Sequence, residues 1–205
     1  MAGGAIRSRF SNGLLAVEIP PGSELVRIHR KVHGPVFFGP APPALAQNRF
    51  DAPAGEYRVL YGAAELTGAF VETVLRKPGR LLRRAEVEDR AWSRLQVMRT
   101  LSVAKLYDEG LQWHGTDASE IGGDAYAPAR QVALELYQAF PDLDGLAYRS
   151  RYNNGQVCVA LFDRVAISDL SPLHTQGFDA VPTIVDQLMR HYGASFDTSL
   201  PVPPP

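Results

Sequence analysis

Three stretches of the chain place hydrophobic residues at the spacing of an amphipathic α-helix, at every third or fourth position. The first follows a small-residue turn at Gly62-Ala63 and runs to Arg76; the others run from 127 to about 140 and from 180 to 191. Their apolar sides consist of Leu66, Phe70, Val71, Val74 and Leu75, of Val132, Leu136 and Phe140, and of Val181, Ile184, Val185 and Leu188. We therefore predict three helices.

Shorter hydrophobic runs between these helices predict β-strands. They lie at Glu24–His29, Arg58–Tyr61, 84–89, 94–99, 101–108, 146–150 and 156–164, with a further short candidate at 36–38. The sequence Asn153-Asn154-Gly155 favours a turn between the last two strands. Segments 39–43 and 114–124 are rich in proline, glycine and other turn residues and are expected to be loops, the second of them exposed. Because strands and helices alternate irregularly, the pattern predicts a single α+β domain over residues 1–205.

The composition narrows the class of protein. The chain has 205 residues, of which 45% are hydrophobic and 21% charged, as in an ordinary globular domain. The net charge of −1 gives no electrostatic reason to expect direct nucleic-acid binding. Neither a signal peptide nor an apolar run of the roughly 20 residues needed to span a bilayer is present, so no membrane association is expected.

The single cysteine and the two ends of the chain complete this picture. Cys158 lies in a continuous apolar run, which predicts an inert thiol in a buried strand and a reducing, cytoplasmic location. Residues 1–23 show weak periodicity and are expected to wrap the surface around a core at about 24–165. Beyond it, residues 166–205 are expected to hold the last helix and a proline-rich tail.

Common catalytic motifs give no support for the standard enzyme classes. His29 and His33 are four residues apart but lack an HExxH pattern, and the other histidines are isolated, so no metal site is expected. The sequence also lacks a GxSxG elbow, a phosphate-binding GxxxxGK[ST] loop and a GxGxxG fingerprint. A standard serine hydrolase, P-loop enzyme or Rossmann dehydrogenase is therefore unsupported.

A different combination of residues occurs around the first helix. Arg49, Tyr61 and Glu72 fall within 24 residues, on a loop, at a strand end and on a helix. Together they are suited to a site that binds a polyanion and stabilises a developing cation. Periodicity alone allows plainer interpretations: Glu72 as part of an exposed polar stripe, Arg49 as an anchor for its loop, and Tyr61 as a core residue whose hydroxyl is satisfied.

The order of several fragments resembles the RES domain family, over roughly residues 24–165. The fragments are Arg27 after an apolar strand, Asn48-Arg49-Phe50, Tyr61-Gly62-Ala63, Ala69-Phe70-Val71-Glu72, and Leu146-Ala147-Tyr148-Arg149-Ser150. The resemblance implies a split mixed sheet similar to the ADP-ribosyltransferase core. It also implies consumption of NAD by hydrolysis, phosphorolysis or ADP-ribose transfer, and membership of an Xre-RES toxin–antitoxin pair.

This resemblance assigns expected roles to five residues. Arg27 and Arg49 would bind the pyrophosphate of NAD, because a guanidinium offers a planar fork of donors. Glu72 would stabilise the positive charge that develops on the ribose as nicotinamide leaves. Tyr61 would stack on a ring of the substrate, and Ser150 would orient Glu72 or the ribose. The expected catalytic set is thus Glu72, Arg49 and Ser150, with Arg27, Arg49, Tyr61 and Ser150 binding the dinucleotide.

The same resemblance implies the partners. NAD is expected as a substrate, with no bound cofactor, and inorganic phosphate is a candidate co-substrate. We favour phosphate or water as the acceptor, and a cognate antitoxin, of the Xre type and encoded by an adjacent gene, as the protein partner. Two alternatives remain: an ADP-ribosyltransferase that modifies a protein target, and a catalytically silent module that only binds its antitoxin.

Overall fold

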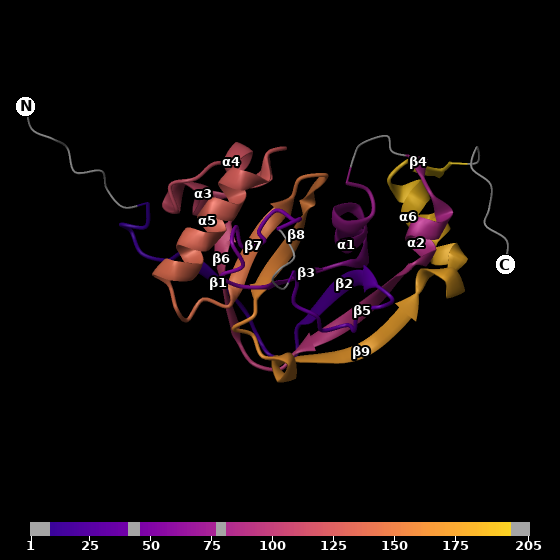
Figure 1. Ribbon diagram of the computed structural model, residues 1–205, viewed down its shortest axis with the longest axis horizontal. Coiled ribbons are helices and arrows are strands. Elements are labelled where there is room, and N and C mark those ends of the chain that lie inside the picture. The colour runs from indigo at the N-terminus through magenta and orange to yellow at the C-terminus, as the bar shows by residue number, and fades with distance from the viewer. Residues whose placement is uncertain (1–8, 41–45, 77–80, 198–205) are drawn as a thin grey trace, which may run out of the picture.

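The computed structural model describes residues 9–40, 46–76 and 81–197, and within them one large mixed sheet dominates (Figure 1). Its strand order is β1-β6-β7-β8-β3-β2-β5-β9, and only β6 and β7 are parallel. The strands are β1 (Ala16–Ile19), β2 (Glu24–Arg30), β3 (Val59–Ala63), β5 (Arg90–Val97), β6 (Leu101–Leu106), β7 (Gly145–Ser150), β8 (Asn153–Phe162) and β9 (Leu170–Gly177). Short strands β4 (Leu81–Leu82) and β10 (Ser195–Phe196) form a separate parallel pair. The expected α+β fold is confirmed.

Helices cover one side of the curved sheet in three groups (Figure 1). They are α1 (Leu66–Thr73), α2 (Arg84–Glu88), α3 (Glu109–Trp113), α4 (Ala118–Gly122), α5 (Tyr126–Ala139) and α6 (Pro182–His191). Helix α1 lies over the middle of the sheet, α3, α4 and α5 lie towards β6 and β7, and α2 and α6 lie towards β5 and β9. Short 3-10 turns at Ile167–Asp169 and Phe178–Ala180 flank β9. None of the helices in the described ranges is long and apolar enough to cross a membrane.

The sheet is split between β2 and β3. These two strands share a single register pair, Val26 with Ala63, although seven residues of β2 pair with β5 and all five of β3 pair with β8. Further along β3, Val59 exchanges both backbone hydrogen bonds with Gly39 instead of with β2. The two halves of the sheet therefore separate beside α1, and a cavity lies in the opening.

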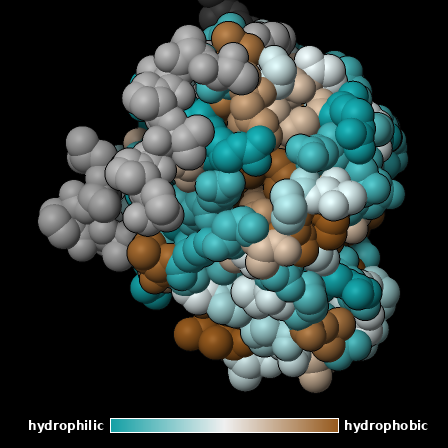
Figure 2. All heavy atoms as spheres, turned by 90° about the vertical axis from the view of Figure 1, so that its right-hand side faces the viewer, coloured by the Kyte–Doolittle hydropathy of each residue, from teal (hydrophilic) through white to brown (hydrophobic). Residues whose placement is uncertain are grey.

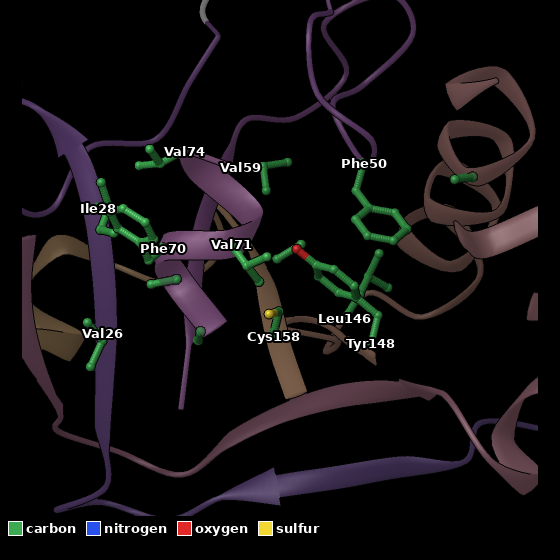
Figure 3. Packing of buried hydrophobic residues seen from close by; sticks show 14 of the residues in the cluster. Val26, Ile28, Phe50, Val59, Phe70, Val71, Val74, Leu146, Tyr148 and Cys158 are labelled. Atoms are coloured by element: carbon green, nitrogen blue, oxygen red, sulfur yellow. The ribbon is translucent and has the colours of Figure 1, made fainter. Parts of the chain in front are cut away.

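Helix α1 is held over this split by its apolar side (Figure 3). Phe70, Val71 and Val74 are almost fully buried, and they lie between Val26 and Ile28 of β2 and the strands on the other side of the split. Burial of one such side chain contributes about 1.5–3 kcal/mol. A second hydrophobic cluster, which includes Leu60, Leu95 and Leu161, fills the other side of the sheet. The walls of the cavity thus rest on packed cores.

The periodicity correctly predicted α5, α6 and β2, and located α1, which ends at Thr73 rather than Arg76. Other predictions were wrong. Residues 84–88 form helix α2 rather than a strand. Only Val87 of the segment is buried, so the alternating buried face of a strand is absent. Residues 36–38 form no strand, since the neighbouring Gly39 makes the bridge to β3. Gly62-Ala63 belongs to β3 and is not a turn.

Two loops also differ from expectation, and two strands of the large sheet were missed. Segment 114–124 contains α4, and His114 is fully buried rather than exposed. Strand β8 begins at Asn153, so the turn lies at 151–152 and not at 153–155. The missed strands are the two edges of the sheet: β1, in the segment expected only to wrap the surface, and β9, where Pro172 interrupts the pattern beside a bulge. The proline-rich tail at 201–205 lies outside the described residues.

The face of the molecule at the β9 and α6 end carries no large apolar surface. Figure 2 shows this face as mostly hydrophilic, with hydrophobic residues in small separate groups. Scattered apolar side chains of this kind are normal on a folded protein.

Candidate functional site

A cavity of about 720 Å³ occupies the split, between β2, β3 and α1. Its charged lining is unusually one-sided. Five arginines contribute to it, namely Arg27, Arg30, Arg49, Arg76 and Arg90, whereas Glu72 is the single carboxylate among the described residues that line it. Four tyrosines, Tyr61, Tyr126, Tyr148 and Tyr152, add aromatic surface. A strongly cationic cavity with aromatic walls is suited to a phosphorylated ligand that carries planar rings.

Glu72 is fixed by the end of a distant strand. Its Oε1 accepts a 2.6 Å hydrogen bond from the hydroxyl of Ser150 and a 3.2 Å bond from the backbone N–H of Arg151. Ser150 is fully buried where β7 ends, 78 residues further along the chain. The interpretation of Glu72 as part of an exposed stripe is therefore wrong, since the side chain faces the cavity and is oriented by two donors.

Ser150 is itself held by its neighbours. Its Oγ accepts 3.2 Å hydrogen bonds from the backbone N–H groups of Tyr152 and Asn153. The hydroxyl proton is therefore directed to Glu72, because the acceptor positions of the oxygen are taken by the turn. This turn places Tyr152 on the cavity wall two residues from the serine. The expected pairing of Ser150 with Glu72 is present in the geometry.

Arg49 is buried and anchored by carbonyl groups. Its Nη1 donates to the backbone oxygens of Ile121 at 3.1 Å and Gly123 at 2.9 Å, at the end of α4. The centre of its guanidinium lies 4.9 Å from the ring centroid of Tyr126. The arginine thus joins its loop to the segment between α4 and α5. Within residues 9–40, 46–76 and 81–197, Arg49 forms no ion pair, and the nearby Asp124 is paired with Arg151 instead.

Arg27 is the least compensated cation of the site. It lies on β2 with 9% of its surface exposed, and among the described residues its Nε and Nη1 have no hydrogen-bond partner. Burial lowers the pKa of Arg27 to about 10, so the side chain still carries its charge at neutral pH. A buried, unpaired donor is costly. Its position on the cavity wall suggests that an anion would satisfy it.

Tyr61 shapes the loop that carries Arg49. Its hydroxyl donates to Oδ1 of Asp51 at 2.9 Å and accepts from the backbone N–H of Phe50 at 3.0 Å. Burial, together with the charge of Asp51, raises the pKa of Tyr61 well above its usual value. Asp51 also accepts from the backbone N–H groups of Gln47 and Asn48. The hydroxyl of Tyr61 is thus bound by the loop, and its ring remains available to contact a ligand in the cavity.

Sequence reasoning missed several residues of this wall. Arg30 and Arg90 are directly opposite each other in the pairing of β2 with β5, although 60 positions separate them. Burial is the main cause that lowers the pKa of Arg90, and the charges of Arg30 and Arg76 add to it. Arg30 had little signal in the sequence, because residues three apart on a regular strand, such as Arg27 and Arg30, point to opposite faces. Arg90 had no signal in the sequence, because its position opposite Arg30 depends on the pairing of β5 with β2.

The remaining candidate chemistry is absent from the described residues. No group of three or more histidine, cysteine or acidic side chains in ranges 9–40, 46–76 and 81–197 is arranged to hold a metal. Cys158 is buried in β8, and burial raises the pKa of its thiol far above the usual value, with Glu72 as a smaller cause. A thiol in that state is a poor nucleophile. The prediction of an inert core cysteine is therefore confirmed.

Comparisons with known proteins agree with the fold. A chain of the crystal structure of the M. tuberculosis MbcT–MbcA toxin–antitoxin complex matches with a TM-score of 0.65 and 15% sequence identity. The match covers 85% of this chain and 92% of that one. A comparison with curated proteins found no match. The model of the RES domain, by contrast, matches residues 24–181, which include all five residues expected at the site. Because that match spans well over half of the sequence, the chain belongs to the RES domain family.

Proposed function

We propose that this protein cleaves the bond between nicotinamide and ribose in NAD. The observation that carries the proposal is that one cavity contains both an oriented carboxylate and unpaired guanidinium groups. A single carboxylate, Glu72, is held by Ser150 on one side, and unpaired guanidinium groups lie on the other. The first suits a cationic transition state, and the second suits a pyrophosphate.

Substrate binding follows from the cationic lining. Arg27 offers buried donors without partners, and Arg49 adds a charge that carbonyl groups hold in place. A pyrophosphate bound here would meet donors that have already lost most of their water and are held in place, so binding would require little reorganisation of the protein. The planar fork of arginine also matches phosphate oxygens with two parallel hydrogen bonds.

The chemical step requires a group that stabilises a developing cation. It does not require a general acid, because nicotinamide leaves as a neutral molecule. The bond between ribose C1′ and the nicotinamide nitrogen breaks, and its electron pair leaves with nicotinamide, which becomes neutral. Positive charge then passes to C1′ and the ring oxygen of the ribose. The carboxylate of Glu72, whose direction is set by Ser150 and the N–H of Arg151, would stabilise this charge. An oxygen of the acceptor finally bonds to C1′.

The acceptor is proposed to be water or inorganic phosphate. Water would lose its proton to solvent and give ADP-ribose, whereas phosphate would give ADP-ribose 1-phosphate. The five arginines of the cavity favour phosphate, because they exceed what a pyrophosphate and Glu72 need for neutralisation. Transfer of ADP-ribose to a protein side chain is the second candidate, and the same cleavage step would serve it.

The biological role that we propose is that of a toxin acting in the cytoplasm. Depletion of NAD would arrest growth, so a separate antitoxin chain, of the Xre type and encoded beside the toxin, would have to cover the site. The similar solved structure is a toxin–antitoxin complex, which supports this assignment. A silent module that only binds its antitoxin would not need the Ser150–Glu72 pair.

One experiment separates these possibilities. Purified protein is incubated with NAD, with and without phosphate, and the products are separated by chromatography. Release of nicotinamide with ADP-ribose 1-phosphate, or with ADP-ribose when phosphate is absent, is expected. NAD that remains intact under both conditions, with the protein folded, would contradict the proposed function. Labelled ADP-ribose found on protein would favour the transferase alternative.

A further inference from the structure

An aromatic pair stands at the end of the cavity where β2 finishes. The rings of His33 and Phe37 are stacked, with centroids 4.2 Å apart and planes 7° from parallel. Both residues line the cavity. Phe37 keeps 38% of its surface exposed, which is unusual for a phenylalanine held in a defined contact. The stack therefore leaves aromatic surface open to a ligand.

The segment that carries this pair is fixed at both ends. The N–H of His33 donates to the carbonyl of Arg30 at 3.0 Å, which closes a turn directly after β2. On the other side, Gly39 exchanges two 3.0 Å hydrogen bonds with Val59 of β3. A Cβ atom at Gly39 would lie 2.9 Å from Cε1 of Phe37, so the absence of a side chain there lets the ring occupy its place. The platform is thus built by the backbone around it.

Cationic groups adjoin the platform, and the catalytic pair lies away from it. Arg30 immediately precedes the turn, Arg90 pairs with it across β2 and β5, and the unpartnered Arg27 lies three residue pairs further along β2. Ser150, in contrast, ends β7, which is separated from β2 by β8 and β3. The two ends of the cavity therefore lie on opposite sides of the split between β2 and β3.

We propose that the His33–Phe37 pair is the binding site for the adenine of the dinucleotide, with the phosphates turned towards Arg27, Arg30 and Arg90. The inference rests on the proposed function and adds the direction in which the substrate lies. Nicotinamide and its ribose occupy the end of Glu72 and Ser150. A flat, uncharged purine stacks on the exposed ring surface at the other end. The arginines between the two ends then face the pyrophosphate.

The test uses two half-ligands and the Glu72→Gln protein, so that nothing is turned over. ADP carries the adenine and two phosphates, and nicotinamide mononucleotide carries the other half. Both affinities are measured by calorimetry in this background and after Phe37→Leu, which keeps an apolar side chain without the ring. Gly39→Ala is a second variant, because it keeps Phe37 and displaces its ring. Val32→Ala is the control, since Val32 is 78% exposed and does not line the cavity.

Phe37→Leu is expected to weaken ADP binding about tenfold and to leave the affinity for nicotinamide mononucleotide unchanged. Gly39→Ala should act in the same direction, and Val32→Ala should change neither. Equal losses for both half-ligands, or no loss for ADP, would overturn the inference. Nicotinamide release by the wild-type protein is followed separately. If it is absent while ADP binding depends on Phe37, the proposed cleavage fails and the adenine site stands.

Discussion

The hydroxyl of Ser150 lies 2.6 Å from Oε1 of Glu72 and donates a hydrogen bond to it. This contact joins the end of β7 to the last turn of α1. Because Ser150 also accepts from two backbone N–H groups, its hydroxyl has one direction available. The geometry thus makes Ser150 a positioning residue, which acts on the substrate through the carboxylate.

Ser150→Ala should lower the rate of NAD cleavage more than it lowers NAD affinity. The carboxylate of Glu72 would lose its shortest hydrogen bond, and misplacement of such a group costs up to roughly 10²-fold in rate. The partly buried N–H groups of Tyr152 and Asn153 would also lose their acceptor, which should lower stability by about 1 kcal/mol. Steady-state kinetics and chemical unfolding measure the two effects. Ser195→Ala, exposed on β10, is the control, and an unchanged kcat would refute the role of Ser150.

Arg27→Met should stabilise the fold and impair function. The arginine is buried with two unpaired nitrogens, so an apolar side chain of similar length removes an uncompensated charge. We expect a gain of about 1–2 kcal/mol in unfolding free energy. Loss of the charged hydrogen bonds to pyrophosphate should weaken NAD binding by about 1.5–3 kcal/mol. A variant that is less stable than wild type, yet binds NAD normally, would show that Arg27 serves the core instead.

The sequence located the parts of the fold that depend on local periodicity. Helices α5 and α6 and strand β2 have regular apolar faces, and each was predicted within a few residues. The edge strands β1 and β9 were missed because few of their side chains are buried, so they show no clear alternation of apolar and polar residues. Pro172 interrupts β9 in addition. Short helices such as α2 were missed because five residues are too few to show a period.

The candidate site was predictable only where a resemblance supplied the order of its fragments. Glu72 and Ser150 come together although 78 residues separate them, and periodicity alone assigned Glu72 to an exposed stripe. The contact of Arg49 with α4 and the pairing of Arg30 with Arg90 depend on loop packing and strand order. No local pattern contains that information, so these relationships required the structure.

Arg49→Lys should reduce NAD use although the charge is kept. Lysine lacks the planar fork that binds phosphate oxygens in pairs, and it cannot reproduce the stacking on Tyr126 together with both carbonyl contacts. The expected cost is about 1.5–3 kcal/mol in kcat/KM. Arg58→Lys, which alters an exposed pair with Asp163, is the matched control. Wild-type turnover in Arg49→Lys would remove this residue from the site.

The stability of the protein should fall between pH 7 and pH 5, in part because of His114. Burial lowers the pKa of this fully buried imidazole, so the folded protein holds it neutral. The unfolded chain binds a proton near pH 6.5, and therefore stability is complete above that pH and is lost as the pH falls. Burial lowers the pKa of His29 as well, with the same sign.

His114→Gln should therefore flatten the dependence of unfolding free energy on pH. One proton accounts for at most about 1.4 kcal/mol per pH unit. Chemical unfolding at pH 5, 6 and 7 gives the slope, and His191→Gln, exposed at the end of α6, should leave it as in wild type. An unchanged slope in His114→Gln would mean that His114 does not contribute to the pH dependence.

Nicotinamide release by Glu72→Gln decides whether the carboxylate of Glu72 stabilises the departing ribosyl cation. Glutamine keeps the shape and one acceptor oxygen, so the bond from Ser150 and the packing of α1 survive, but the negative charge is lost. An interaction made mainly in the transition state appears in kcat rather than in affinity. Turnover should fall by at least about 10²–10³-fold, with NAD affinity by calorimetry close to that of wild type.

Glu65→Gln provides the control, because Glu65 immediately precedes the same helix and bonds Thr67 and Gln156 on the exterior. It should release nicotinamide at the wild-type rate. Loss of turnover with retained NAD binding is expected in Glu72→Gln alone. Unchanged nicotinamide release from that variant would contradict the proposed mechanism.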